Sequence, residues 1–334
     1  MTNRERVIAS LNHQQPDRVP YCVDFTVKAH AKMADFYGDP DFAGKLGNAL
    51  STLSTALPDG WREVAREIWE DEFGVQWNRA VDKDIGVVCN QRITPEMLED
   101  YRFPDPHDLR RWQPYPAALE NNNGRFFVAN IGFSLFERAW TLCGMENLLM
   151  AMVENPDFVH KLLNRILAHN LARIEHACSY DIDAMMFGDD WGSQQGLIMG
   201  PRLWDAFIRP RVRDMYQTVR ARGKYVFIHS CGKVQSLFPA LIDCGLHCFN
   251  PFQPEVMDAF DMKRRYGARL SFYGGISTQK TLPYGTPGQV REEVRRLLHE
   301  VGKDGGYIAA PSHAIPGDAK AENIAAMIEV LRNP

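Results

Sequence analysis

From residue 125 onward, short apolar runs alternate with amphipathic helical segments, and this alternation constrains the fold more than any other feature of the chain. The apolar runs fall at residues 126–129, 184–187, 225–228, 247–249, 270–273 and 307–310. Helical segments are predicted at residues 145–152, 156–179, 201–222, 233–244, 257–266, 286–301 and 321–332. Continuously apolar runs are typical of strands buried on both faces, and strands that alternate with helices form βαβ units. The sequence therefore predicts a parallel sheet covered by helices.

The N-terminal part of the chain contributes two more predicted strands. Residues 21–25 form a short apolar run after a predicted helix at 3–13, and part of a hairpin near 75–89 gives the second strand. The stretch from 26 to about 71 is expected to be helical. Eight parallel strands predict an α/β fold, a (β/α)8 TIM barrel, as one domain over residues 1–334. That domain carries an N-terminal helical extension and a hairpin insertion near 75–89.

A doubly wound open sheet is the alternative α/β fold for this alternation of strands and helices. The nucleotide-binding version of that fold carries a Gly-x-Gly-x-x-Gly turn after a strand. No predicted strand is followed by such a turn, which favours the barrel.

The composition excludes several classes of function. With a formal net charge of −4, the chain has no overall basic field of the kind that binds nucleic acid. No run of apolar residues is long enough for a membrane span, and the start of the chain has no signal-peptide hydrophobic region, so we expect a cytoplasmic protein. The seven cysteines are odd in number and scattered, which does not indicate a disulfide framework.

Polar residues follow nearly every predicted strand. In a barrel the carboxyl ends of the strands meet at one mouth, where the loops carry the active site, so this asymmetry indicates an enzyme. In chain order the residues at these ends are Asp24, Asn130, Asp189, Asp190, His229, Cys231, Asn250, Gln253, Glu255, Gly275, Ser312 and His313.

The pair His229 and Cys231 predicts a metal site. An imidazole and a thiolate two residues apart can bind one zinc ion, and a catalytic zinc site needs a third protein ligand and an open position. His313 is the best third ligand, because it follows the last strand as His229 follows an inner one. Asp189 or Glu255 are carboxylate alternatives. The alternative interpretation is that His229 and Cys231 are a packed imidazole and thiol that bind no metal.

The remaining residues at the strand ends are divided into two predicted roles. Asp189, Asp24 and Glu255 are predicted to be catalytic, as a proton donor, a general base or a group that orients a ligand. The structural alternative is that such carboxylates cap a helix or bind local backbone amides. Five residues are predicted to bind substrate or cofactor, namely Asn130, Asp190, Asn250, Gln253 and Gly275.

Several segments together resemble the uroporphyrinogen decarboxylase-like superfamily over nearly the whole chain. The resemblance implies a (β/α)8 barrel, in agreement with the strand count. The resemblance rests on residues 4–13 with 16–20, 188–195 (Gly-Asp-Asp-Trp-Gly-Ser-Gln-Gln), 229–232 (His-Ser-Cys-Gly), 250–254 (Asn-Pro-Phe-Gln-Pro), 274–276 (Gly-Gly-Ile) and 310–313 (Ala-Pro-Ser-His).

The resemblance implies one of two activities. True decarboxylases of this superfamily carry an arginine-rich segment near the N-terminus that binds the carboxylates of uroporphyrinogen, and the stretch 24–30 lacks it. The zinc-dependent methyltransferases share the His-x-Cys motif, which maps onto His229 and Cys231. Their third ligand is a cysteine after the last strand, and His313 stands at that position here.

The sequence therefore favours a methyltransferase that uses Zn²⁺ and moves a methyl group between a small substrate, a methyl ether or a thiol, and a corrinoid protein. Related barrels are often dimers, so the resemblance also allows a homodimer. Two alternatives stay open: a cofactor-free decarboxylase or lyase, and a non-catalytic protein that binds a tetrapyrrole.

Overall fold

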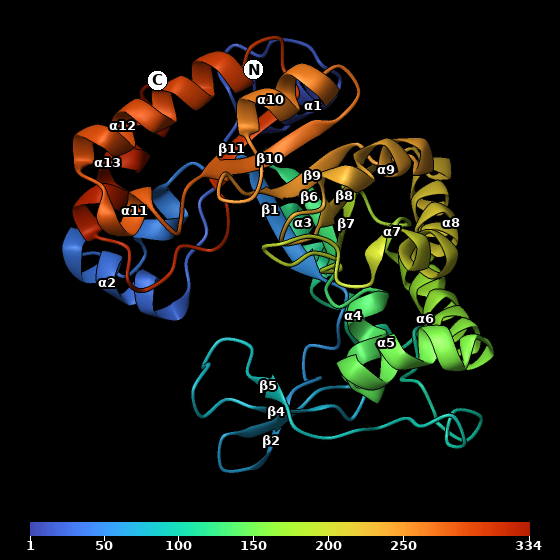
Figure 1. The fold of residues 1–334 in the computed structure, drawn as a ribbon. Helices are drawn as coiled ribbons and strands as arrows, with labels where there is room; N and C mark the ends of the chain where they lie inside the picture. The colour runs from blue at the N-terminus through green and yellow to red at the C-terminus, as the bar shows by residue number, and fades with distance from the viewer.

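The computed structural model describes all of residues 1–334 (Figure 1). Its strands are β1 (Leu50–Ser54), β2 (Arg62–Ala65), β3 (Ile68–Glu70), β4 (Gln76–Asn78), β5 (Val87–Val88), β6 (Phe126–Ile131), β7 (Ala184–Gly188), β8 (Tyr225–His229), β9 (Cys248–Phe252), β10 (Ser271–Ile276) and β11 (Tyr307–Pro311). Its helices are α1 (Asn3–Leu11), α2 (Val27–Tyr37), α3 (Tyr115–Glu120), α4 (Phe136–Cys143), α5 (Met145–Glu154), α6 (Pro156–Ala177), α7 (Gly200–Leu203), α8 (Arg209–Ala221), α9 (Phe238–Cys244), α10 (Ala259–Tyr266), α11 (Thr281–Tyr284), α12 (Pro287–Arg296) and α13 (Ala321–Arg332).

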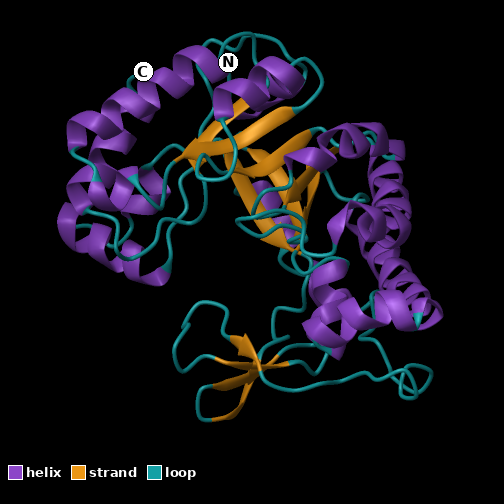
Figure 2. Ribbon diagram, viewed as in Figure 1, coloured by secondary structure: helices purple, strands orange, loops and turns teal.

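Seven parallel strands form one curled sheet in the order β1-β6-β7-β8-β9-β10-β11. Figure 2 shows these strands at the centre with helices along the outside. A cluster of 75 buried hydrophobic residues includes side chains of both the strands and the covering helices. Because both faces of the sheet are buried, its strands read as continuous apolar runs, which is why the sequence predicted β6 to β11.

Helix α1 closes the amino-terminal end of the curled sheet. Val7 and Leu11 belong to a separate cluster of 13 buried residues, whose other members come mainly from the inner faces of the strands. The backbone N–H of Gly306, just before β11, donates to the carbonyl of Ser10 at 2.7 Å. With this end filled by apolar side chains, the carboxyl ends of the strands are left for a site.

The barrel prediction is correct only in part, because no regular eighth strand closes the sheet. Residues 20–25 lie in the gap between β11 and β1, where they make two isolated parallel bridges. Tyr21 pairs with Ala309, and Phe25 pairs with Ile315. The structure is therefore a seven-stranded half-open barrel with an irregular segment in the eighth position.

The side chain of Asn48 takes the place of strand hydrogen bonds on one side of this segment. Its Oδ1 accepts from the N–H of Val23 at 2.9 Å, and its Nδ2 donates to the Val23 carbonyl at 3.1 Å. One backbone bond, from the N–H of Ala49 to the carbonyl of Tyr21, completes the contact with the residues before β1. Pro20 begins the segment without an N–H to donate, which is a physical reason for its irregular pairing.

The prediction of helix from 26 to about 71 is wrong beyond α2. Residues 50–54 form β1, and 62–70 form β2 and β3. The hairpin near 75–89 is confirmed as the antiparallel pair β4 and β5, but it belongs to a separate four-stranded sheet and supplies no barrel strand. Figure 1 shows this sheet apart from the barrel strands. Strand β2 is exposed throughout and β1 is rich in Ser and Thr, so neither carries the apolar pattern of a buried strand.

No helix in the structure combines the length and the apolar character needed to cross a membrane.

Replacing Asn48 with alanine tests its role in completing the barrel wall. The change removes both hydrogen bonds to Val23, and we expect the free energy of unfolding to fall by about 1–3 kcal/mol. Urea denaturation followed by circular dichroism measures the loss. The matched control is Asn333→Ala at the exposed C-terminus, which should change stability by less than about 0.5 kcal/mol. Equal stabilities for the two variants would show that Asn48 does not hold the segment.

Candidate metal centre

His229 is the last residue of β8, and the parallel register places it between two residues of neighbouring strands. Its Cα partner on β7 is Gly188, and its Cα partner on β9 is Asn250. Paired residues of parallel strands point to the same face of the sheet, so His229 and Asn250 lie side by side. Gly188 has no side chain, and a Cβ there would lie 3.4 Å from the Cα of Gly132.

Asn250 fixes the orientation and tautomer of the His229 ring. The Nδ2 of Asn250 donates to the carbonyl of Tyr273 at 3.0 Å, so its Oδ1 is the atom that faces His229. That Oδ1 lies 2.6 Å from Nδ1 of His229, which must therefore carry the proton and donate. Nε2 is left with a free lone pair, which is the arrangement found in histidines that bind metals.

Two backbone contacts fix the position of Cys231 in the loop after β8. Its N–H donates to Oδ1 of Asp190 at 2.8 Å. Gly232, with φ of +84°, packs so closely on Gly192 that a Cβ there would lie 2.4 Å from a backbone atom of Gly192. Only glycine fits this approach and this backbone conformation. The loops after β7 and β8 therefore hold Cys231 rigidly.

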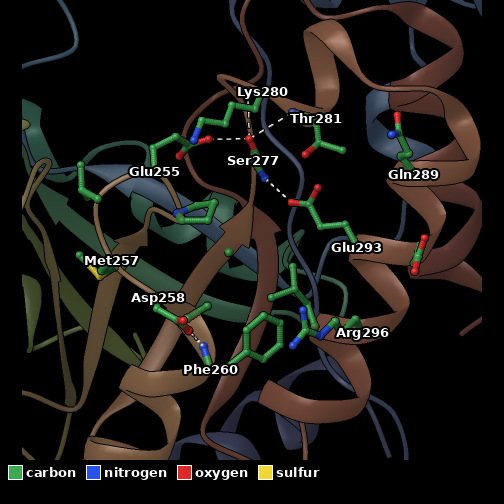
Figure 3. Close-up of a pocket in the computed structure, with 16 residues that line it drawn as sticks. Glu255, Met257, Asp258, Phe260, Ser277, Lys280, Thr281, Gln289, Glu293 and Arg296 are labelled. Atoms are coloured by element: carbon green, nitrogen blue, oxygen red, sulfur yellow. Dashed lines mark hydrogen bonds between the residues drawn. The ribbon is translucent and has the colours of Figure 1, made fainter.

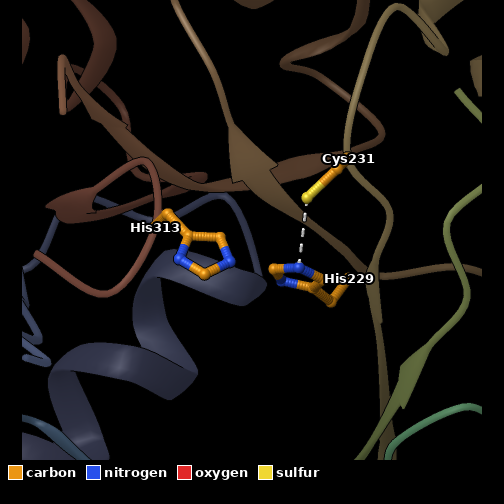
Figure 4. Close-up of side chains that lie close together, drawn as sticks. All are labelled: His229, Cys231 and His313. Atoms are coloured by element: carbon orange, nitrogen blue, oxygen red, sulfur yellow. Dashed lines mark hydrogen bonds between the residues drawn. The ribbon is translucent and has the colours of Figure 1, made fainter. Parts of the chain in front are cut away.

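His229, Cys231 and His313 converge at the carboxyl ends of the strands, as the sequence predicted (Figure 4). One ligand atom from each lies within 4.8 Å of the other two, and Sγ of Cys231 is 3.4 Å from Nε2 of His229. Ligand atoms of a tetrahedral zinc ion are about 3.3–3.6 Å apart, by the usual bond lengths. The pair already has this spacing, and His313, which is exposed, needs only a small approach. The donor set fits Zn²⁺.

Burial shifts the pKa values of both His229 and Cys231 toward their neutral forms. Burial, followed by the charge of Asp190, raises the pKa of the Cys231 thiol well above its usual range. Burial lowers the pKa of His229, although Asp190 and Asn250 act in the opposite direction. A neutral imidazole is ready to bind a cation, while a thiol of raised pKa is not a nucleophile by itself. The thiolate form of Cys231 needs a bound cation.

Asp189 is fully buried, and its carboxylate is held by four donors. It accepts from the backbone N–H groups of Leu135, Phe136 and Glu137 at 3.2, 3.1 and 2.8 Å. The indole Nε1 of Trp191 donates to it at 2.5 Å. Three of these donors lie at the start of α4, where a negative charge is also favoured by the helix dipole. Asp189 thus holds the start of α4 beside the proposed metal ligands. A carboxylate that accepts four hydrogen bonds is better suited to positioning other groups than to transferring a proton.

Glu137 is a site residue that the sequence did not single out. It lies near Cys231, Asp189 and Asp190, and burial followed by the charges of the two aspartates raises its pKa well above the usual range. A protonated carboxyl in this place can donate a hydrogen bond. The signal in the sequence that could have identified Glu137 is its place in the segment that follows a predicted strand.

Glu255 and Gly275 lie in a different cavity from the three metal-ligating side chains. This second cavity, of about 740 Å³, is formed by the loop after β9, the end of β10, and α11 and α12 (Figure 3). There Oε1 of Glu255 accepts from the hydroxyl of Ser277 at 2.5 Å, and Ser277 N–H donates to Glu293 at 2.8 Å. The β9–β10 register shifts between the pairs Phe249–Phe272 and Phe252–Gly274, with the extra residue on β9. A Cβ on Gly275 would lie 2.8 Å from the hydroxyl oxygen of Tyr307.

The metal-ligating histidines border a cavity of about 710 Å³ that also includes Asp24, Asn250 and Tyr273. Its volume is typical of sites for small molecules. The structure thus brings two of the predicted site residues, Asp24 and Asn250, to the same space as His229 and His313. The binding roles predicted for Asn130 and Gln253 stay predictions, because no side-chain contact of either residue indicates a ligand.

The family model described as uroporphyrinogen decarboxylase (URO-D) matches residues 70–334. A uroporphyrinogen decarboxylase from Pseudomonas fluorescens is 24% identical over 246 residues, which cover 70% of this chain and 67% of that protein. The methylcobamide:CoM methyltransferase MtaA of Methanosarcina barkeri is 26% identical over 344 residues, which cover 98% of this chain and 96% of that protein. The solved structure of a methyltransferase from Methanosarcina mazei has the same fold, with a TM-score of 0.74, 18% identity, and 99% and 98% of the two chains covered.

Replacing Asn250 with alanine tests the metal centre without touching a ligand. The change frees the His229 ring to rotate and removes the acceptor for its Nδ1 proton, so we expect zinc affinity to fall about 10–100-fold. Competition with a chromophoric chelator measures the affinity. Asn147→Ala on α5 is the control, because its side chain bonds to residues 91 and 143, away from the site. Unchanged affinity in Asn250→Ala would contradict the proposed orientation of His229.

Proposed function

The chain belongs to the uroporphyrinogen decarboxylase family, and from this premise we propose that it is a zinc-dependent methyltransferase. It would transfer a methyl group between a small substrate, a methyl ether or a thiol, and a corrinoid protein docked over the barrel mouth. The zinc ligands in this proposal are His229, Cys231 and His313. The observation that carries the proposal is their convergence within 4.8 Å at the carboxyl ends of the strands.

The lengths of the sequence matches support methyl transfer over decarboxylation. The Methanosarcina barkeri methyltransferase aligns with nearly the whole chain, whereas two bacterial uroporphyrinogen decarboxylases align over about two thirds of their own length. The methyltransferase therefore matches more of this chain than either decarboxylase does.

The charge of the cavity supports the same choice. Arg125 is the one Lys or Arg side chain among the residues that line the 710 Å³ cavity, and its Nε donates to the carbonyl of Asn122. A porphyrinogen carries several carboxylates, and enzymes bind such groups with arginines or lysines. This cavity is poorly suited to a polyanion of that kind.

A zinc ion at this centre would act as a Lewis acid that lowers the pKa of a bound thiol or polarises a methyl ether oxygen. Asn250 would keep Nε2 of His229 aimed at the ion. Asp190 and the contact between Gly232 and Gly192 would hold Cys231 against it. His313 is exposed, so the ion would lie where a second protein can approach.

The neighbouring acidic groups have separate roles in this proposal. Asp189 would keep the start of α4 against the site, through the N–H groups of Leu135, Phe136 and Glu137. Glu137, whose raised pKa favours the protonated form, would donate a hydrogen bond or a proton near the reacting atoms. Glu255 would act only on a ligand in the neighbouring cavity.

Metal analysis of protein purified without an affinity tag tests the proposal. We expect about one zinc ion per chain, and methyl transfer from methylcobalamin to a thiol, giving a thioether and cob(I)alamin, that a chelator abolishes. Cys231→Ser should lose the zinc and reduce transfer by about 100-fold or more, because it removes the single thiolate ligand. Cys89→Ser is the matched control, since Cys89 is exposed and lies in the antiparallel sheet region.

Three results would contradict the proposal and identify the alternatives. Protein without zinc, together with a Cys231→Ser variant of unchanged stability and activity, would exclude the metal centre. Release of CO₂ from a carboxylate substrate in the presence of chelator would indicate a cofactor-free decarboxylase. A visible absorption band on adding a tetrapyrrole, with no turnover, would indicate a binding protein.

A further inference from the structure

Asp24 directs a carboxylate into the same cavity as the metal-ligating histidines. Its backbone is fixed on both sides, because its carbonyl accepts from the N–H of Ile315 at 2.8 Å and Asn48 holds the preceding Val23. Ile315 lies two residues after His313, so the same loop positions the carboxylate and the third metal ligand. Asp24 therefore belongs to the cavity wall.

The Asp24 carboxylate has no cationic partner in the protein. It takes part in none of the ion pairs, and its single side-chain contact is a weak one from Sγ of Cys22 at 3.9 Å. The side chain is exposed to the cavity, while burial by the surrounding protein raises its pKa. An unpaired carboxylate on a cavity wall can accept a hydrogen bond from a ligand or pair with a cation that the ligand carries. The protein leaves that role to a ligand.

Asp24 makes no ion pair with the one cationic side chain that lines the cavity. Arg125 lines the same cavity but does not pair with the Asp24 carboxylate, and its Nε is committed to the carbonyl of Asn122. His229 and His313 line the same cavity as Asp24. The rest of the wall is mixed, with apolar side chains that include Leu53, Phe127 and Met186 among others.

We propose that Asp24 selects the charge class of the substrate, by binding an ammonium or hydroxyl group of a small methyl donor that carries no anionic group. This inference deepens the proposed function and rests on it, because it takes the ligand of this cavity to be the methyl-bearing molecule. The methyl-bearing heteroatom faces the metal centre, and the hydrogen-bond donor of the same molecule meets Asp24. Substrates with a carboxylate or sulfonate at that position are disfavoured by repulsion from Asp24.

A series of three compounds of similar shape tests the proposal. The probes are 2-methoxybenzylamine, 2-methoxybenzyl alcohol and 2-methoxybenzoate, which share a methyl ether and carry a cationic, a neutral and an anionic group. Isothermal titration calorimetry with the zinc-loaded protein measures their binding without turnover. We expect the amine and the alcohol to bind at least about 10-fold more tightly than the benzoate, from the usual strength of a charge-assisted hydrogen bond.

Asp24→Asn keeps the shape of the side chain and removes its charge. In this variant we expect the amine to bind about 10-fold more weakly and the benzoate to bind more tightly, so that the preference collapses. Asp35→Asn is the matched control, because Asp35 is exposed on α2 and its side chain makes no hydrogen bond. Thermal denaturation confirms that each variant is folded.

The result that overturns the proposal is benzoate bound as tightly as the amine in the wild type, or an order of affinities that Asp24→Asn leaves unchanged. Failure of all three probes to bind also overturns it. Failure of the proposed function looks different, because it appears as missing zinc or missing methyl transfer. A charge preference that depends on Asp24 would be seen in the binding data whether or not methyl transfer occurs.

Discussion

The parallel register of β7, β8 and β9 is the constraint on which the rest of the site depends. It makes Gly188, His229 and Asn250 neighbours in one row at the carboxyl edge of the sheet. In one orientation of its side-chain amide, Asn250 makes hydrogen bonds through both Oδ1 and Nδ2. That orientation places the proton of His229 on Nδ1 and leaves the lone pair on Nε2. A shift of one residue in this register would turn both side chains to the opposite face.

Most of the acidic and glycine residues around the centre hold it together instead of taking part in chemistry. Asp189 binds the start of α4, Asp190 binds the backbone of Cys231, and Gly192 and Gly232 let two loops touch. Pre-organised ligands of this kind bind a metal with little loss of entropy. Helix α1 fills the other end of the barrel with apolar side chains, so that the polar groups gather at one mouth.

The sequence predicted the parts whose pattern is unambiguous. The strands β6 to β11 are continuous apolar runs and were placed within a few residues, and the helix at Ala321–Arg332 was placed to the residue. Strand β1 was missed because three of its five residues are Ser or Thr and only Leu50 is buried, so it carries no apolar run. Residues 21–25 were predicted to be a strand, but they form an irregular segment. The hydrogen bonds of the Asn48 side chain replace strand pairing there, and such bonds have no sequence pattern.

The convergence of His229, Cys231 and His313 was predictable, because all three residues lie at or just after the ends of strands whose carboxyl ends meet. Glu255 and Gly275 were expected at the same mouth, but they line a neighbouring cavity. The register shift between β9 and β10 lies just before both residues, and such a shift has no sequence pattern. The most direct test of the central claim is X-ray absorption at the zinc K-edge of the zinc-loaded protein. The account predicts one sulfur neighbour at about 2.3 Å and nitrogen or oxygen neighbours at about 2.0 Å, with one imidazole lost in His313→Ala. A zinc shell without sulfur, or one that His313→Ala leaves unchanged, would contradict it.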